Sequence, residues 1–155
     1  MYGHKKKYIH DPLGRVEKVI QYDTNEVVLH EKSYNHDNNG NVLFENEYIY
    51  HNNALLRSFV ITRTYDCMNR LLTETTGHGE SSQKTVTISY NPQGKKSSIK
   101  KADGVCLNYS YDAQGRLKSV SSSDQTILYK YYYDSRDNII CVEDLINNTK
   151  LERSY

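Results

Sequence analysis

A seven-residue turn motif occurs six times along the chain. Each copy begins with an aromatic residue, continues with Asp or Asn, and carries Gly, Asn or Asp four residues after the aromatic. The aromatic residues stand at positions 10, 36, 65, 90, 111 and 133, so successive copies are 26, 29, 25, 21 and 22 residues apart. A period of about 20 to 50 residues is typical of an array of structural repeats. We therefore expect the chain to work as an array rather than through one catalytic pocket.

The residue types of the motif are those of a three-residue β-hairpin connection. Asp or Asn at the first turn position accepts hydrogen bonds from backbone N–H groups just ahead, and Gly, Asn or Asp at the fourth position adopts a positive φ. Both prolines, Pro12 and Pro92, stand at the second position, which a type I turn favours for proline. The predicted structural turn residues are Asp11 and Gly14, Asp37 and Gly40, Asp66 and Asn69, Asn91 and Gly94, Asp112 and Gly115, and Asp134 and Asp137. The sequence thus predicts six β-hairpins.

The segments between the turns predict strands. Stretches such as 55–64 and 126–132 are rich in β-branched and aromatic residues, and no 11-residue window shows a helical stripe. Each unit is expected to contain about two strands and the whole chain about twelve. The predicted fold class is all-β: an antiparallel array of β-hairpins, forming a single domain over residues 1–155.

The composition narrows the class of protein further. Hydrophobic residues make up 37% of the chain, and its aromatic residues are 15 Tyr and 2 Phe, with no Trp. Tyrosine suits a thin or hollow sheet, in which a ring packs while its hydroxyl stays near polar groups. The formal net charge of +1 argues against a nucleic-acid partner. No apolar run is long enough for a membrane span, and the first residues do not form a signal peptide.

Catalytic and metal-binding motifs are missing from the sequence. The three cysteines, Cys67, Cys106 and Cys141, are odd in number and lack CxxC spacing, so we expect free thiols. No histidine pair has the spacing of a zinc motif. The acidic turns differ from calcium-binding EF-hand loops because glycine falls at the fourth position rather than the sixth. We expect no cofactor, no metal and no enzymatic activity.

One tyrosine cluster is a candidate binding site. Tyr129, Tyr131 and Tyr133 are expected on one face of a strand and Tyr132 on the other. Exposed rings of this kind stack on sugars, which suggests a carbohydrate- or cell-surface-binding module as the alternative function. The competing interpretation is that the three-tyrosine face is the stacking row of the repeat itself.

The segment 109–117, with the pattern Tyr-x-Tyr-Asp-x-x-Gly-Arg-Leu, resembles the YD repeat of Rhs and teneurin-type proteins, and 131–139 is a second close copy. The resemblance covers nearly the whole chain. It implies a β-spiral that forms a hollow shell, which encloses a toxin in bacterial members and serves adhesion at the cell surface in teneurins. The expected function is therefore a structural shell or scaffold segment without chemistry of its own, secreted or at the cell surface.

The sequence departs from the family pattern in two ways. His10 and His36 replace the repeat tyrosine, and Asn69 and Asp137 replace the repeat glycine. The core segment and toxin domain that follow the repeats in bacterial members do not occur in this sequence.

Tyr155 lies 22 residues after Tyr133, so the array is expected to be truncated within a seventh unit. The expected partners are flanking repeats or a toxin domain of a larger protein, a glycan, and other copies that associate through open strand edges.

Overall fold

The computed structural model describes residues 5–77, 79 and 81–154, and every regular element among them is a β-strand. The strands are β1 Lys5–His10, β2 Val16–Tyr22, β3 Val28–His36, β4 Val42–His51, β5 Ala54–Tyr65, β6 Leu71–Thr76, β7 Lys84–Tyr90, β8 Lys96–Lys100, β9 Cys106–Tyr111, β10 Leu117–Ser122, β11 Leu128–Tyr133, β12 Ile139–Asp144 and β13 Thr149–Glu152. The prediction of an all-β antiparallel hairpin array is confirmed, with 13 strands rather than about twelve.

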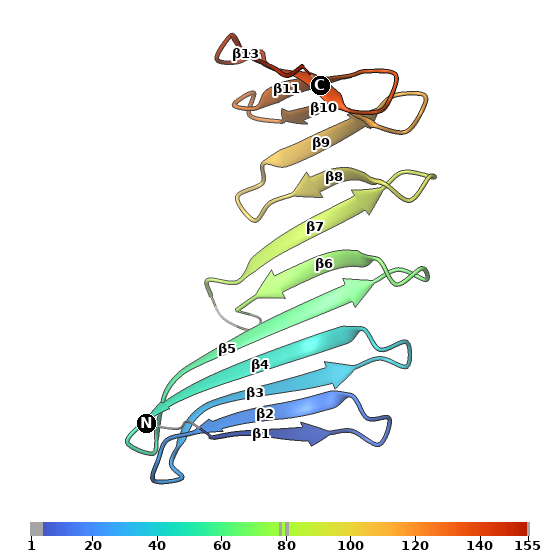
Figure 1. Ribbon diagram of the computed structural model, residues 1–155. Coiled ribbons are helices and arrows are strands. Elements are labelled where there is room, and N and C mark those ends of the chain that lie inside the picture. The colour runs from blue at the N-terminus through green and yellow to red at the C-terminus, as the bar shows by residue number, and fades with distance from the viewer. Residues whose placement is uncertain (1–4, 78, 80, 155) are drawn as a thin grey trace. The chain divides into compact units, whose positions relative to one another are not determined.

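The chain divides into two compact units, Met1–Thr85 and Val86–Tyr155, with the boundary inside β7. Within the first unit, strands β1 to β6 follow one another in chain order, and each pairs antiparallel with its neighbours. Within the second unit, β7 to β13 do the same (Figure 1). Whether the two units work as the single array expected from the sequence stays a prediction.

The six repeat turns lie between β1 and β2, β3 and β4, β5 and β6, β7 and β8, β9 and β10, and β11 and β12. In each turn the fourth residue has a positive φ, between 60° at Asn69 and 88° at Gly40. Glycine adopts this conformation without steric cost, and Asn and Asp are the least strained substitutes. The sequence departures at Asn69 and Asp137 therefore keep the same backbone path.

A β-bulge follows every repeat turn. His10 pairs with Val16 and Ile9 with Lys18, which leaves Glu17 as an extra residue in β2. The equivalent extra residues, each seven positions after the turn aromatic, are Leu43, Leu72, Ser97, Lys118 and Ile140. A bulge bends its strand and increases the local twist, so each repeat adds the same local distortion to its hairpin.

The connections at the opposite ends of the strands are more varied. Asn52 and Asn53, with φ values of 49° and 62°, form a two-residue turn between the long strands β4 and β5. Glu26 has a φ of 62° at the fourth position of a turn that starts at Asp23, and Gln125 has a φ of 61° between β10 and β11. Between β6 and β7, His78 and Glu80 lie outside the described residues.

Few side chains are buried, as expected for a thin sheet. Among the described residues, only Ile88, Cys141 and Ser122 are buried. Stability must therefore come mainly from hydrogen bonds and packing between neighbouring hairpins, and the repeat turns are where such hydrogen bonds recur.

Candidate functional site

Each repeat turn is closed by the same backbone and side-chain hydrogen bonds. In the turn of Asp112, the Asp112 N–H donates to the Arg116 carbonyl and the Gly115 N–H donates to the Asp112 carbonyl, both at 2.9 Å. The Asp112 carboxylate accepts the Arg116 backbone N–H at 2.8 Å. The same carboxylate contact to the backbone four residues ahead occurs at Asp11, Asp37, Asp66 and Asp134, and the Asn91 side-chain oxygen makes it in the fourth turn.

The second carboxylate oxygen binds the side chain that follows the turn. Asp112 accepts the Arg116 guanidinium at 2.7 Å, and Asp66 accepts that of Arg70 at the same distance. Where this residue is asparagine, as at Asn41, its side-chain amide donates to the turn aspartate instead. The Arg or Asn of the motif therefore supplies a side-chain donor that holds the turn carboxylate.

These contacts lower the pKa of the turn carboxylates. At Asp37 the main cause is the side-chain hydrogen bond from Asn41, and at Asp66 it is the backbone N–H of Arg70. At Asp112, burial alone would raise the pKa, but the hydrogen bonds and positive charge of Arg116 lower it. The carboxylates are thus ionised structural acceptors at neutral pH, and their environment does not prepare them for proton transfer.

The same donor side chains reach from one turn to the next. The Arg15 guanidinium donates to the Asp37 carbonyl at 2.6 Å, and the Asn41 amide donates to the Asn69 side chain at 2.8 Å. In the second unit, the Lys95 ammonium donates to the Gly115 carbonyl. The Arg116 guanidinium contacts the Asp137 carboxylate at 2.6 Å and the Asp134 carbonyl at 3.5 Å.

The repeat tyrosine makes the reverse contact, back to the preceding hairpin. The hydroxyls of Tyr65, Tyr111 and Tyr133 donate to the carbonyls of Val42, Lys96 and Leu117, at 3.1, 2.8 and 2.8 Å. In each case the acceptor stands six residues after the aromatic of the preceding repeat. Burial raises the pKa of all three hydroxyls, which keeps them protonated as donors.

Cations cover two of these rings. The Arg116 guanidinium carbon lies 4.6 Å from the ring centre of Tyr133, and the Lys95 ammonium lies 5.3 Å from that of Tyr111. Cation–π contacts at these distances are attractive. We call the alternating contacts between successive turns, from tyrosine hydroxyl to carbonyl and from cation to the next turn, the turn ladder.

Sequence reasoning predicted the positions of the turns but missed the turn ladder. The signal was present in the composition, because a phenylalanine at the repeat position would pack equally well and lacks the hydroxyl. The repeat aromatic is tyrosine in four of six copies and phenylalanine in none. A preference for tyrosine over phenylalanine at a fixed repeat position indicates that its hydroxyl has a partner.

The tyrosine cluster of β11 divides between the two faces of the strand. Tyr131 pairs with Val142 and Tyr129 with Asp144, whereas Tyr132 pairs with Cys141 on the opposite face. Tyr133 is engaged in the turn ladder. Tyr132 is 42% exposed, and its hydroxyl donates to the Glu143 carboxylate at 2.7 Å, the main reason that its pKa is raised. The cluster therefore does not form one continuous aromatic platform.

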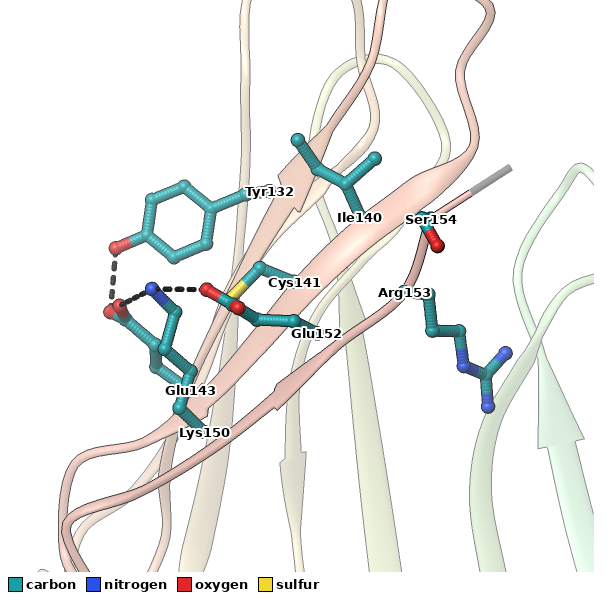
Figure 2. Close-up of a pocket in the computed structure, with 8 residues that line it drawn as sticks. All are labelled: Tyr132, Ile140, Cys141, Glu143, Lys150, Glu152, Arg153 and Ser154. Atoms are coloured by element: carbon teal, nitrogen blue, oxygen red, sulfur yellow. Dashed lines mark hydrogen bonds and ion pairs between the residues drawn. The ribbon is translucent and has the colours of Figure 1, made fainter.

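Tyr132 lines an open cavity of about 660 Å³ beside β13, shown in Figure 2. The other lining residues are Ile140, Cys141, Glu143, Lys150, Glu152, Arg153 and Ser154. The Lys150 ammonium lies 2.8 Å from Glu152 and 3.9 Å from Glu143. The charged groups are two carboxylates and two cations, so the cavity favours neither sign of ligand. Across the part of the chain that the structure describes, no group of three or more His, Cys, Asp or Glu could hold a metal ion.

A series of ion-paired side chains lies on the first unit, where the second unit has tyrosines and aliphatic residues. The contacts run through His30, Glu47, Lys32, Glu45, Arg63 and Glu74, with N···O distances of 2.6, 3.3, 3.4, 3.1 and 2.8 Å. Arg63 pairs across strands with Glu74, as Tyr131 pairs with Val142 and Ile88 with Ile99. Burial would lower the pKa of Arg63, but its hydrogen bonds to Glu74 and Glu45 raise it.

Comparison with known proteins finds structures with a similar fold. No protein-family model matches the sequence, and the search of curated proteins gives no match. Among solved structures, the crystal structure of TcdB2-TccC3 without its hypervariable C-terminal region aligns with 92% of this chain, at a TM-score of 0.51 and 14% identity. The chain has the YD-repeat fold.

The YD-repeat array corresponds to a small part of that structure. The alignment covers 10% of the TcdB2-TccC3 chain, so this chain spans about a tenth of the length of its structural neighbour. A second crystal structure of TcdB2-TccC3 aligns over 92% of this chain and 11% of its own, with a TM-score of 0.45 and 14% identity. No helix in the described part of the chain is long and apolar enough to cross a membrane.

Proposed function

We propose that this chain is a wall segment of an Rhs-like YD-repeat shell and carries no catalysis of its own. The observation that carries the proposal is the turn ladder. Its hydrogen-bond donors and acceptors bind one hairpin to the next. Examples are the bond from Tyr133 to Leu117 and the bond from Arg116 to Asp137. A side chain used in this way holds neighbouring repeats together and is not free to act on a substrate.

The YD-repeat fold supports the same reading. The similar structure, TcdB2-TccC3, is much longer than this chain and was solved without its hypervariable C-terminal region. By analogy, the partners of the wall segment are further repeats and an enclosed domain of a larger protein, which is secreted or displayed at the cell surface. Enclosure of a toxin is the specific form of containment that we propose.

The glycan-binding alternative has less support. Of the candidate tyrosines, Tyr133 donates its hydroxyl to the Leu117 carbonyl and Tyr132 donates to Glu143. Stacking on a sugar needs exposed rings on one surface, and Tyr131 and Tyr132 point to opposite faces.

The first test is the mass of the natural product in its source cell, read with an antibody raised to this chain. The wall proposal expects a band far above 18.0 kDa. Limited proteolysis of that larger protein should leave its enclosed segment intact until the shell is unfolded. A natural product of 18.0 kDa, or an enclosed segment cut as fast as an exposed linker, would contradict the proposal.

A further inference from the structure

Four consecutive strands of the second unit, β8 to β11, carry lysines and no acidic residue. Within their bounds stand Lys96, Lys100, Lys118 and Lys130, all of them exposed, and neither Asp nor Glu. In the first unit, by contrast, Lys18 lies 2.9 Å from the carboxylate of Glu31 on the neighbouring strand. Among the described residues, the ammonium groups of Lys100, Lys118 and Lys130 have no hydrogen-bond or ion-pair partner. These three charges are therefore available to a ligand.

The strand register places two of these lysines on one face together with small polar side chains. Ser98 pairs with Asn108, Ser110 with Ser119, and Ser119 with Lys130. Directly paired residues of an antiparallel sheet share a face, and residues two apart in a strand do so as well, which adds Lys100 beside Ser98. We call the surface formed by Ser98, Lys100, Asn108, Ser110, Ser119 and Lys130 the lysine–serine face.

An open cavity of about 430 Å³ adjoins the lysine–serine face beside the turn of Asp112. Lys118, Lys130 and Tyr132 line it, so Lys130 belongs to both the face and the cavity. Asp112 is the acidic residue of the lining, and the Arg116 guanidinium already binds its carboxylate at 2.7 Å. The cavity therefore combines two unpaired cations with a carboxylate that is already paired, which favours an anionic ligand. Its volume lies within the range of small-ligand sites.

We propose that the lysine–serine face and this cavity bind an acidic polysaccharide, with one carboxylate or sulfate group of the polymer between Lys118 and Lys130. The three free ammonium groups complement the charge of such a polymer. Serine and asparagine side chains both donate and accept hydrogen bonds, as the hydroxyl groups of sugars do. This mode of binding uses charge and hydrogen bonds, so it needs no stack of tyrosine rings. The proposal goes beyond the wall function and does not rest on it.

The lysine–serine face is less suited to other polyanions. Single-stranded nucleic acid binds where aromatic rings accompany the positive charge, because its bases stack on them. Tyr109, Tyr111 and Tyr131 lie on the opposite face of these strands, since they alternate with Ser110 and Lys130. An acidic peptide offers carboxylates but few hydroxyl groups to pair with the serines. The combination of lysine with serine and asparagine therefore favours a sugar polymer.

The test is the binding of a fluorescent chondroitin sulfate oligosaccharide to the whole chain, measured by anisotropy. Lys100→Glu, Lys118→Glu and Lys130→Glu should each raise the dissociation constant about three- to tenfold, because each removes a favourable charge pair and adds an unfavourable one. Raising the salt concentration should weaken binding by the natural chain, since exposed charges are screened.

Lys96→Glu is the matched control for Lys100→Glu. Lys96 is exposed, stands on the same strand and undergoes the same change of charge, but it pairs with Tyr90 and lies on the tyrosine face. It should change the dissociation constant least of the four variants. Urea unfolding should give the same midpoint for Lys100→Glu, Lys118→Glu and Lys130→Glu as for the natural chain, because these lysines have no partner to lose.

A second measurement separates sugar recognition from attraction to any polyanion. The double variant Ser110→Ala with Ser119→Ala removes both members of a hydrogen-bonded hydroxyl pair, so neither is left without its partner. It should weaken binding of the chondroitin sulfate probe several-fold and leave binding of an oligoglutamate of equal charge unchanged. A neutral maltodextrin should not bind.

Three results would overturn the proposal: no binding of the probe by the natural chain, a loss with Lys96→Glu as large as with Lys100→Glu, or equal affinity for oligothymidylate or oligoglutamate of the same charge. If a Lys→Glu variant unfolds, Lys→Gln at the same position repeats the test with a smaller change. None of these results bears on the wall function, which does not depend on binding a polysaccharide.

Discussion

At the scale of single residues, the repeat tyrosine can stabilise the fold through its hydroxyl hydrogen bond as well as through the packing of its ring. Tyr133→Phe keeps the ring but deletes the hydrogen bond to the Leu117 carbonyl. We expect it to lower the free energy of unfolding by about 0.5 to 1.5 kcal/mol, as for a typical hydrogen bond. Tyr131→Phe is the control, because the hydroxyl of Tyr131 has no hydrogen-bond partner among the residues that the structure describes. Equal effects in urea unfolding would show that the turn ladder adds no stability.

The turn carboxylates make stability depend on acid pH. The pKa of Asp112 is lower in the folded chain than its ordinary value of 3.8, so ionised Asp112 favours folding. That contribution is complete above pH 3.8 and is lost as the pH falls through the folded pKa. Asp112→Asn keeps the backbone acceptor, as Asn91 does in the fourth turn, but loses the charge that binds Arg116.

We therefore expect Asp112→Asn to be less stable than the natural chain at neutral pH, with a difference that shrinks as the pH falls below 3.8. Urea unfolding at a series of pH values measures this directly. A difference that stays constant across the series would mean that the carboxylate charge plays no part in the turn.

At the scale of elements, the charged trio of Arg63, Glu45 and Glu74 replaces the apolar cross-strand pairs found in the second unit. Removing the Arg63 guanidinium alone leaves the half-buried carboxylates of Glu45 and Glu74 without this ion-pair partner. Arg63→Tyr should destabilise the chain by about 1 to 2 kcal/mol, less than the 3 to 5 kcal/mol of a fully buried pair. The triple variant with Glu45→Val and Glu74→Val restores the tyrosine and valine pattern and should recover most of the loss, since apolar replacements of buried ion pairs are often neutral or better.

Thermal and urea unfolding of the single and triple variants measure the coupling among the three residues. A triple variant less stable than Arg63→Tyr would mean that the replaced carboxylates have another stabilising role, for which the contact of Glu45 with Lys32 is the obvious source.

The hairpins show which elements could be predicted from sequence and which could not. The repeat turns were predictable because Asp at the first position and Gly at the fourth are local requirements of backbone geometry. The bulge residues, such as Glu17 and Lys118, were not, since an extra residue in a strand has no fixed side-chain preference. The Asn52-Asn53 turn was missed although paired Asn residues suit its positive φ values, because it lies outside the repeat.

The candidate site shows the same division. The residues of the turn ladder are in the predicted turns or beside them, yet the ladder joins positions 15 to 28 residues apart, such as Tyr133 and Leu117. The series of ion pairs through Arg63 and Glu45 likewise depends on strand register. Register is set by pairing across strands, so neither set of contacts could be derived from local sequence alone.

At the scale of the whole molecule, interactions that join only neighbouring hairpins should give local stability. In arrays of this kind, stability is approximately a sum of repeat and nearest-neighbour contributions. Tyr133→Phe should therefore speed amide hydrogen exchange in β9 to β12 and leave β3 to β5 unchanged. Tyr65→Phe, which deletes the equivalent bond to the Val42 carbonyl in the first unit, should do the reverse. Exchange measured by mass spectrometry on both variants is the test. Equal acceleration along the whole chain in both would mean that the two units unfold as one cooperative body, so that a defect in one turn destabilises every hairpin.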